Sequence, residues 1–250
     1  MKITPIKVDH VDHMGSDLSV VNAARVSFDK MSDWAYSEAA LTPDPCDPEA
    51  TFWHNPRALS KADTKLIHYL AKHNHWSPFA HTSIQLRIKA PIFVARQLVK
   101  HQVGGVWNEV SRRYVDREPE FYFPEVWRGR PTDGAKQGSS GVVQHNVYAN
   151  DSAKQTVNLA LEIYNELLKC GVAPEQARMI LPQNTMTEWI WTGSLMFFAR
   201  VCKQRLDPHA QAETSEVAQQ IANIVRPLFP VSWPALTSNE KEVQNEQPAS

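Results

Sequence analysis

The sequence predicts an α+β fold, in which helices flank a mixed or antiparallel sheet within a single domain. Two strand patterns and several helix patterns occur along the chain, without the regular strand–helix alternation that a parallel sheet requires. The 250 residues are 42% hydrophobic and 21% charged, which is the composition of an ordinary globular protein. We expect the domain to span residues 1–236 and a polar, frayed tail to occupy 237–250.

Two helix patterns stand in the first third of the chain. Residues 16–28 begin with Ser16 and Asp17, either of which can cap a helix. The sequence Ser60-x-x-Asp63 resembles a capping box and precedes a run with one apolar face. We therefore expect one helix at 16–28 and a second one that starts just after Ser60.

A proline-rich segment and a strand follow these patterns. Four prolines between residues 42 and 57 predict an irregular insertion over about 30–57. Residues 82–90 alternate between apolar and polar side chains, which predicts a half-buried strand. Pro91 ends this strand and suits the first turn of a helix over 92–101.

The second half of the chain begins with an aromatic-rich, extended segment over 119–127. The segment 128–141 carries four glycines and is expected to be a second irregular insertion, in the form of a loop within the domain. Further helices are expected at 150–170, 174–182, 194–204 and 209–227, with a strand at 185–191.

Charge and cysteine content exclude several classes of protein. The 26 Lys and Arg against 27 Asp and Glu leave a net charge of −1, which argues against binding by bulk attraction to nucleic acid or anionic membrane. No apolar run approaches the ~20 residues that span a bilayer. The first residues hold no apolar signal core, so we expect a cytoplasmic protein. Cys46, Cys170 and Cys202 form no metal-ligand spacing and no disulfide framework.

The densest polar cluster spans residues 100–114 and straddles two adjacent glycines, which allow the backbone to approach a ligand closely. Ser111, Arg112 and Arg113 offer a hydroxyl and two guanidinium groups, which suit a phosphate. Glu109 could accept a hydrogen bond from a ligand or pair with an arginine. The alternative is a solvated helix end whose charges pair with one another.

Two smaller clusters are equally ambiguous. His73, His75 and His81 could hold a zinc ion, although hydrogen-bonded surface histidines or rings stacked near a cofactor fit the pattern too. Arg205 either pairs with Asp207 to brace a corner between helices or faces an anionic ligand. Arg178 allows the same two interpretations.

Taken together and in this order, the clusters resemble the flavin-dependent thymidylate synthase family. The resemblance rests on Met14–Leu18, Ala23–Phe28, His75–Phe79, Ala90–Gln97, Asn108–Tyr114, Ala177–Pro182, Arg205 and Asp207–Gln211. The family signature is Arg-His-Arg, seven residues and then Ser. Here Lys100-His101-Gln102 stands in place of the triplet and eight residues precede Ser111, so one residue is inserted near Gly104.

The resemblance implies an FAD-dependent methyltransferase that reductively methylates dUMP to dTMP. Methylenetetrahydrofolate would donate the one-carbon unit, and FAD reduced by NADPH would supply the hydride. It also implies a homotetramer whose active sites are shared between chains. Neither a metal nor an enzyme nucleophile is implied.

The resemblance also implies roles for individual residues. Arg205 is the implied catalytic residue and would stabilise negative charge on the uracil. The implied cofactor-binding residues are His75, Ser77, Lys100, His101, Gln102, Glu109, Ser194 and Arg200. The implied dUMP-binding residues are Gln97, Lys100, Glu109, Ser111, Arg112, Arg113, Arg178 and Arg205. The alternatives are a zinc-dependent hydrolase built on His73, His75 and His81, and a nucleotide- or RNA-binding relative without turnover.

Overall fold

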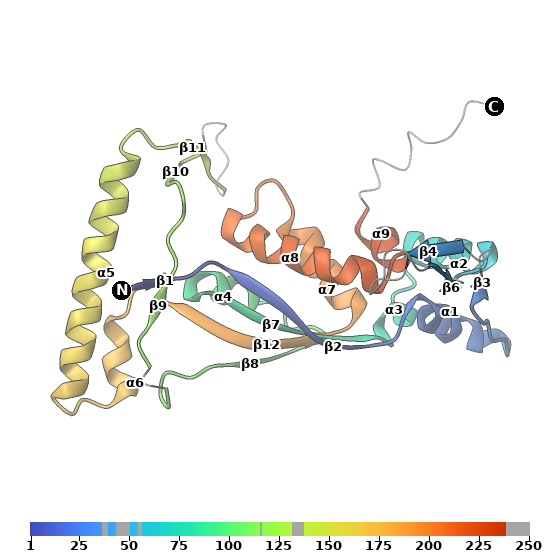
Figure 1. Ribbon diagram of the computed structural model, residues 1–250, viewed down its shortest axis with the longest axis horizontal. Coiled ribbons are helices and arrows are strands. Elements are labelled where there is room, and N and C mark those ends of the chain that lie inside the picture. Colours follow the sequence, from blue (N-terminus) through green and yellow to red (C-terminus); the bar gives the residue numbers. More distant parts are fainter. Residues whose placement is uncertain (37–39, 44–50, 55–56, 116, 132–137, 239–250) are drawn as a thin grey trace. The chain divides into compact units, whose positions relative to one another are not determined.

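The computed structural model describes residues 1–36, 40–43, 51–54, 57–115, 117–131 and 138–238 (Figure 1). The chain divides into two compact units. Unit 1 contains Met1–Asp12, Ile84–Gly193 and Phe197–Ile224, and unit 2 contains His13–Ser83, Ser194–Met196 and Val225–Ser250. Among the described residues, no helix is both long and apolar enough to cross a bilayer.

A four-stranded sheet forms the centre of unit 1. Its strands lie in the order β2 (Lys7–Met14), β7 (Ser83–Pro91), β12 (Met186–Gly193) and β8 (Gly105–Glu109). β12 pairs antiparallel with both β7 and β8. This sheet, with the helices around it, confirms the predicted α+β fold class.

The apolar side chains of β7 explain why it is a central strand. Ile84, Leu86 and Ile88 are buried while the intervening side chains are less so, which confirms the predicted alternation. Pro91 takes a β conformation and precedes α4 (Ile92–Leu98), as the sequence predicts. The helix ends three residues before the predicted end.

Most helices of unit 1 fall where the sequence predicts them. They are α4, α5 (Asn146–Lys169), α6 (Pro174–Ala177) with a 3-10 turn at Arg178–Ile180, α7 (Leu195–Arg205) and α8 (Ala212–Leu228). α7 and α8 continue into unit 2 at one end. α5 packs Val157, Leu161 and Tyr164 against Phe121 and Ala177, and these side chains form an apolar core.

One aromatic ring accounts for the pair of facing glycines in the sheet. Gly105 of β8 lies opposite Gly193 of β12. A Cβ at Gly193 would lie 2.3 Å from Cδ1 of Phe197, and a Cβ at Gly105 would lie 2.4 Å from its Cζ. The two glycines therefore leave room for the ring, which packs α7 against the strands and brings the start of β8 close to that helix.

Short paired segments complete unit 1, and one pair corrects a sequence prediction. β1 (Lys2–Ile3) pairs parallel with β9 (Glu120–Phe121), so only two residues of the extended segment 119–127 form a strand. β10 (Arg128–Gly129) pairs with β11 (Ser140–Val142), within the segment predicted as a loop. Residues 132–137 of that loop lie outside the described residues.

Unit 2 is mainly helical. It contains α1 (Asp17–Arg25) with a 3-10 turn at Val26–Phe28, α2 (Lys61–Lys72), α3 (Ser77–Ala80) and α9 (Ser232–Thr237). The backbone N–H of Asp63 donates to the Ser60 hydroxyl at 3.1 Å, which confirms the predicted cap of α2. Asp63 also pairs with Arg25 at 2.5 Å and thereby ties α2 to α1.

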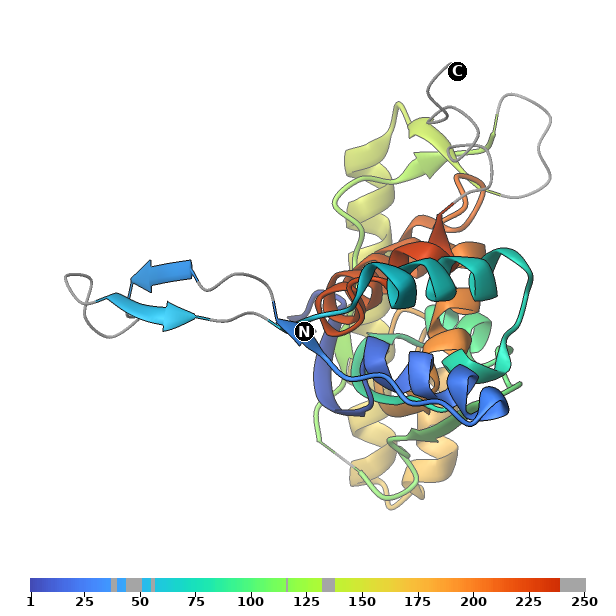
Figure 2. The same cartoon turned by 90° about the vertical axis from the view of Figure 1, so that its right-hand side faces the viewer.

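The proline-rich segment is not wholly irregular, so that prediction is wrong in part. β4 (Ala40–Pro43) and β5 (Thr51–His54) form an antiparallel ribbon, which Figure 2 shows, and β3 (Ala35–Tyr36) pairs with β6 (Arg57–Ala58). Prolines at strand ends are compatible with such edges. Residues 37–39, 44–50 and 55–56 of the insertion lie outside the described residues, as does most of the predicted tail.

Candidate functional site

Arg205, at the end of α7, is held from two sides. Its Nε donates to Nε2 of His101 at 3.0 Å, and its backbone oxygen accepts a hydrogen bond from the Ser215 hydroxyl at 2.6 Å. Asp207 does not brace it. Among the described residues Arg205 forms no ion pair, and the Asp207 carboxylate accepts from the backbone N–H of His209 at 2.8 Å. The corner between the helices is thus built by a turn, and α8 begins only at Ala212 rather than at 209.

His101 accepts a hydrogen bond from a permanent cation, so its Nε2 must be unprotonated. Burial, followed by the positive charges of Arg205 and Arg200, lowers the pKa of His101 below its usual value of 6.5. The imidazole is therefore neutral near pH 7 and carries its proton on Nδ1. This tautomer orients the guanidinium of Arg205.

Lowering the pH should reduce the free energy of unfolding partly through protonation of His101. The unfolded chain takes up a proton near pH 6.5, whereas the folded chain does so only at lower pH. The stability contribution of the neutral ring is thus fully present above pH 6.5 and is lost as the pH falls through the folded pKa. We expect the wild-type free energy of unfolding to fall between pH 7 and pH 5 more steeply than that of His101→Gln. Parallel denaturant titrations would test this, and equal slopes would contradict it.

Positive charge without a carboxylate partner surrounds His101. Arg200 of α7 donates to the backbone oxygen of Val103 at 2.6 Å and so contacts the loop after the triplet. Lys100 and Gln102 are exposed. In the described part of the chain, neither Lys100 nor Arg200 forms an ion pair. The arrangement of these cations around a neutral ring suits an anionic ligand.

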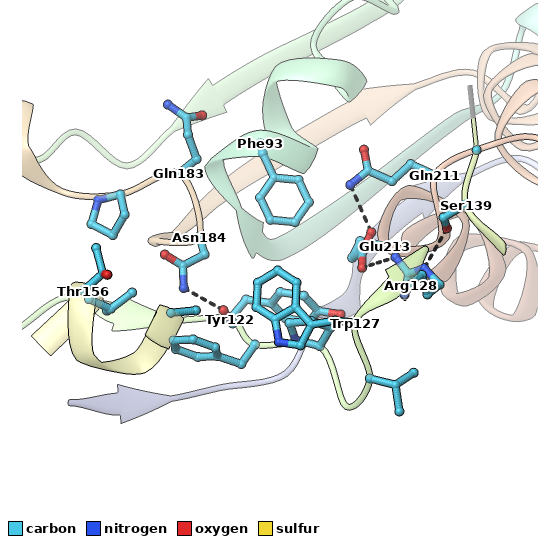
Figure 3. Close-up of a pocket in the computed structure, with 17 residues that line it drawn as sticks. Phe93, Tyr122, Trp127, Arg128, Ser139, Thr156, Gln183, Asn184, Gln211 and Glu213 are labelled. Atoms are coloured by element: carbon cyan, nitrogen blue, oxygen red, sulfur yellow. Dashed lines mark hydrogen bonds and ion pairs between the residues drawn. The ribbon is translucent and has the colours of Figure 1, made fainter. Parts of the chain in front are cut away.

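Gln97, on α4, ends a chain of hydrogen bonds that begins at Glu213. Glu213 is only 5% exposed and pairs with Arg128 at 2.5 Å. The Gln211 amide nitrogen donates to Glu213 at 3.0 Å, and the Gln211 amide oxygen accepts from Gln97. The Gln97 amide oxygen in turn accepts from the Thr214 hydroxyl at 3.1 Å. Figure 3 shows the Gln211–Glu213–Arg128 part of this chain.

The charge state of Glu213 follows from its partners. Burial favours the neutral acid, but the hydrogen bonds from Arg128 and Gln211 outweigh that effect and hold the pKa of Glu213 below its usual range. The carboxylate therefore stays ionised and accepts hydrogen bonds only.

A second group of predicted residues meets at a small hollow of about 100 Å³. Glu109, Arg112 and Arg178 line it, together with Thr187 and apolar side chains. The Glu109 carboxylate accepts from the Thr187 hydroxyl at 2.7 Å and from the Trp107 indole at 3.2 Å, which holds it at the end of β8. The structure thus brings together three of the eight residues assigned to dUMP.

Ser111 and Arg113 lie beside each other in the turn that follows β8. The Ser111 hydroxyl accepts from the backbone N–H of Arg113 at 3.3 Å and from its Nε at 3.1 Å. Arg113 is exposed. Among the described residues, no hydrogen bond or ion pair joins this turn, or the hollow beside it, to the Arg205 cluster.

The remaining predicted residues belong to unit 2. His75 and Ser77 are exposed around the start of α3, and Ser194 is half-buried just before α7. His75 and His73 both contact the ring of Tyr69, with centroids 5.9 and 4.3 Å apart respectively. The described residues contain no group of three His, Cys, Asp or Glu side chains that could hold a metal, so the zinc-hydrolase alternative has no support.

Sequence reasoning missed a larger cavity of about 660 Å³ in unit 1 (Figure 3). Phe93, Tyr122 and Trp127 line its aromatic side, and Gln211 and Glu213 lie at its polar edge. The aromatic density of residues 119–127 was visible in the sequence. Its meeting with the start of α8 was not, because those segments lie about 90 residues apart.

Comparisons with known proteins identify the family to which the chain belongs. The family model Thy1, described as thymidylate synthase complementing protein, matches residues 10–231. A flavin-dependent thymidylate synthase of Thermus thermophilus is 37% identical over 225 residues, which cover 90% of this chain and 73% of the relative. A flavin-dependent thymidylate synthase of Thermosipho africanus is 34% identical over 90% of this chain and 88% of its own length.

A solved structure extends the comparison to the fold. The crystal structure of the UMP/dUMP methylase PolB from Streptomyces cacaoi, bound with 5-Br dUMP, is similar with a TM-score of 0.77 and 28% identity. The match covers 95% of this chain and 97% of that one. The architecture described above is therefore shared with a protein that binds a pyrimidine nucleotide analogue.

Proposed function

The chain belongs to the Thy1 family of thymidylate synthase complementing proteins, and from that premise we infer that it is a flavin-dependent thymidylate synthase. It methylates dUMP to dTMP with FAD as cofactor, and methylenetetrahydrofolate and NADPH serve as co-substrates. Neither the hydrolase alternative nor the alternative of a binding protein without turnover is supported by the relatives.

One observation carries the proposal more than any other. Arg205 is positioned by a neutral His101 and has no carboxylate partner among the described residues. Such a guanidinium is free to face negative charge that develops on a substrate. When the uracil ring is activated for attack on the one-carbon unit, charge accumulates on its oxygens, and Arg205 would stabilise it there.

The residues present fit a flavin dinucleotide. Its pyrophosphate needs cations and N–H donors, and Lys100 and Arg200 supply uncompensated positive charge beside His101 and Gln102. By the same resemblance, His75, Ser77, Ser194 and Glu109 are also proposed to contact FAD. Once reduced by NADPH, bound FAD would supply the hydride that converts the transferred one-carbon unit into a methyl group.

The dUMP phosphate is proposed to bind the guanidinium groups of Arg112, Arg113 and Arg178 and the hydroxyl of Ser111. Glu109, held by Thr187 and Trp107, would act as a fixed acceptor at the same end. Lys100, Gln97 and Arg205 would contact the base from the other cluster. Because no hydrogen bond or ion pair joins Arg205 and His101 to the Ser111 turn or its hollow in the described chain, we propose that one site draws these two groups from different chains of a homotetramer.

FAD uptake tests this proposal directly. A ligand that binds only the native state stabilises it by about 2.7 kcal/mol at a hundredfold excess over its Kd. We therefore expect FAD to raise the melting temperature of the protein, the purified protein to show flavin absorption, and the loaded protein to form dTMP from dUMP, methylenetetrahydrofolate and NADPH.

Riboflavin is the matched control ligand, since it has the same ring system without phosphates. It should shift the melting temperature much less than FAD does if the Lys100 and Arg200 charges act on the pyrophosphate. A colourless protein with no thermal shift and no product would overturn the proposed function.

A further inference from the structure

The hydrogen-bond chain from Glu213 to Gln97 has a fixed direction. An ionised carboxylate accepts hydrogen bonds and cannot donate them, so the edge of Gln211 that faces Glu213 must be its NH₂ group. The Gln211 oxygen is then left to face Gln97, which must present its own NH₂ group to it. The Gln97 oxygen consequently lies at the Thr214 hydroxyl, which donates to it.

Reversing the Gln97 amide would disturb the whole chain. Either two amide oxygens would face each other between Gln97 and Gln211, or Gln211 would also reverse and place its oxygen against the Glu213 carboxylate. Both arrangements lose a hydrogen bond between partly buried groups and place like partial charges together. The ion pair with Arg128 keeps the starting point of the chain in place.

After these two hydrogen bonds, the Gln97 amide can still donate through one N–H and accept through one oxygen lone pair. The fixed orientation of the amide decides which side presents the donor and which side presents the acceptor. A uracil ring offers a donor at N3 and an acceptor at O4, and one orientation of an amide satisfies both. A cytosine ring offers the opposite pattern, an acceptor at N3 and a donor at the 4-amino group, which needs the reversed amide. A freely turning amide pairs with either ring, whereas a locked amide pairs with only one.

We propose that Glu213 is a specificity-determining positioning residue: by fixing the orientation of the Gln97 amide, it makes the site accept uracil nucleotides and reject cytosine nucleotides. The proposal rests on the proposed function, in which Gln97 contacts the base of dUMP. Sites built to hydrogen-bond one pattern reject the opposite one strongly, because buried polar groups are left unpaired.

The test compares the Kd values of dUMP and dCMP for the FAD-loaded protein, measured by calorimetry. We expect the wild type to prefer dUMP. In Glu213→Gln, the amide at position 213 can donate or accept a hydrogen bond, so the Gln211 and Gln97 amides can both reverse. The ratio of the dCMP Kd to the dUMP Kd should then fall about tenfold or more, which corresponds to ~1.4 kcal/mol. Glu162→Gln changes an exposed carboxylate on α5 that lies outside the hydrogen-bond chain and should leave the ratio unchanged.

A second variant allows the inference to be tested even if Glu213→Gln does not fold. Gln211→Leu leaves the Arg128–Glu213 pair intact and cuts the chain in its middle, so it should lower the same ratio. A folded variant of either kind with a wild-type dUMP/dCMP ratio would overturn the inference about Glu213. Failure of the wild type itself to bind dUMP would instead overturn the proposed function, and with it the inference.

Discussion

Replacing Arg205 with alanine should reduce dTMP formation by about 10²–10³-fold while FAD stays bound, because removing one preorganised donor typically costs that much in turnover. The guanidinium is oriented by His101 and has no carboxylate partner in the described chain, so it is available to the negative charge that develops on the uracil. Steady-state turnover with saturating dUMP and folate, together with flavin absorbance, would measure the two effects separately.

Lys203→Ala is the matched control, since Lys203 is an exposed cation on the same helix and lies outside the proposed site. It should retain wild-type turnover. Near-wild-type turnover in Arg205→Ala with both substrates in excess would refute the catalytic role of Arg205, and loss of FAD from that variant would show that its contact is with the cofactor.

Mixing two inactive variants should restore activity if the site is shared between chains. Take Arg205→Ala and Ser111→Ala, which damage the two separate clusters of unit 1. In randomly assembled hybrids, about a quarter of the sites would combine an intact Arg205 cluster with an intact Ser111 turn, because each site draws its two halves independently. Activity should therefore return to about that fraction of wild type, measured on hybrids whose composition is confirmed by mass.

A second pair of variants provides the control for this experiment. Arg205→Ala and Gln97→Ala both change residues that we propose contact the base from the same chain, so every site would carry a defect in that half and mixing should restore nothing. Hybrids of Arg205→Ala with Ser111→Ala that stay as inactive as their parents would show that one chain carries the whole site, and would leave the proposed chemistry untouched.

Local patterns predicted the elements whose cause is local. The alternation of Ile84, Leu86 and Ile88 predicted β7, and the Ser60 cap predicted the start of α2, because both signals lie within a few residues of the structure that they determine. The glycine after α5 likewise marks its end, since Gly171 has a positive φ of 84°.

Elements stabilised by distant partners escaped the same reasoning. β8 has no clear alternation and exists because it pairs with β12. α9 was missed because its first N–H groups are capped by Asp17, which accepts from Val231 and Ser232 at 2.8 and 2.9 Å across more than 200 residues of sequence. A cap of this kind cannot be recognised from the residues around the helix itself.

The candidate site likewise combines residues that the sequence indicated with interactions that only the fold brings together. The resemblance to a known family named Gln97 and Arg205, but it did not reveal that Glu213 orients the first through Gln211. Arg128, which anchors Glu213, lies 85 residues before it in sequence. Pairings of this length are set by the fold, so only coordinates connect them.

The tryptophans of the sheet give this enzyme a built-in optical reporter. The indoles of Trp107 and Trp189 stack with centroids 4.2 Å apart and planes 17° from parallel, and Trp191 approaches Trp107 edge-on at 5.3 Å. Rings this close share their electronic excitation, which generates a strong signal in ultraviolet circular dichroism. Because the Trp107 indole donates to Glu109, a nucleotide that forms a hydrogen bond with that carboxylate also changes the environment of the coupled indoles. Ligand binding to the edge strand can thus be followed in the native protein without a label.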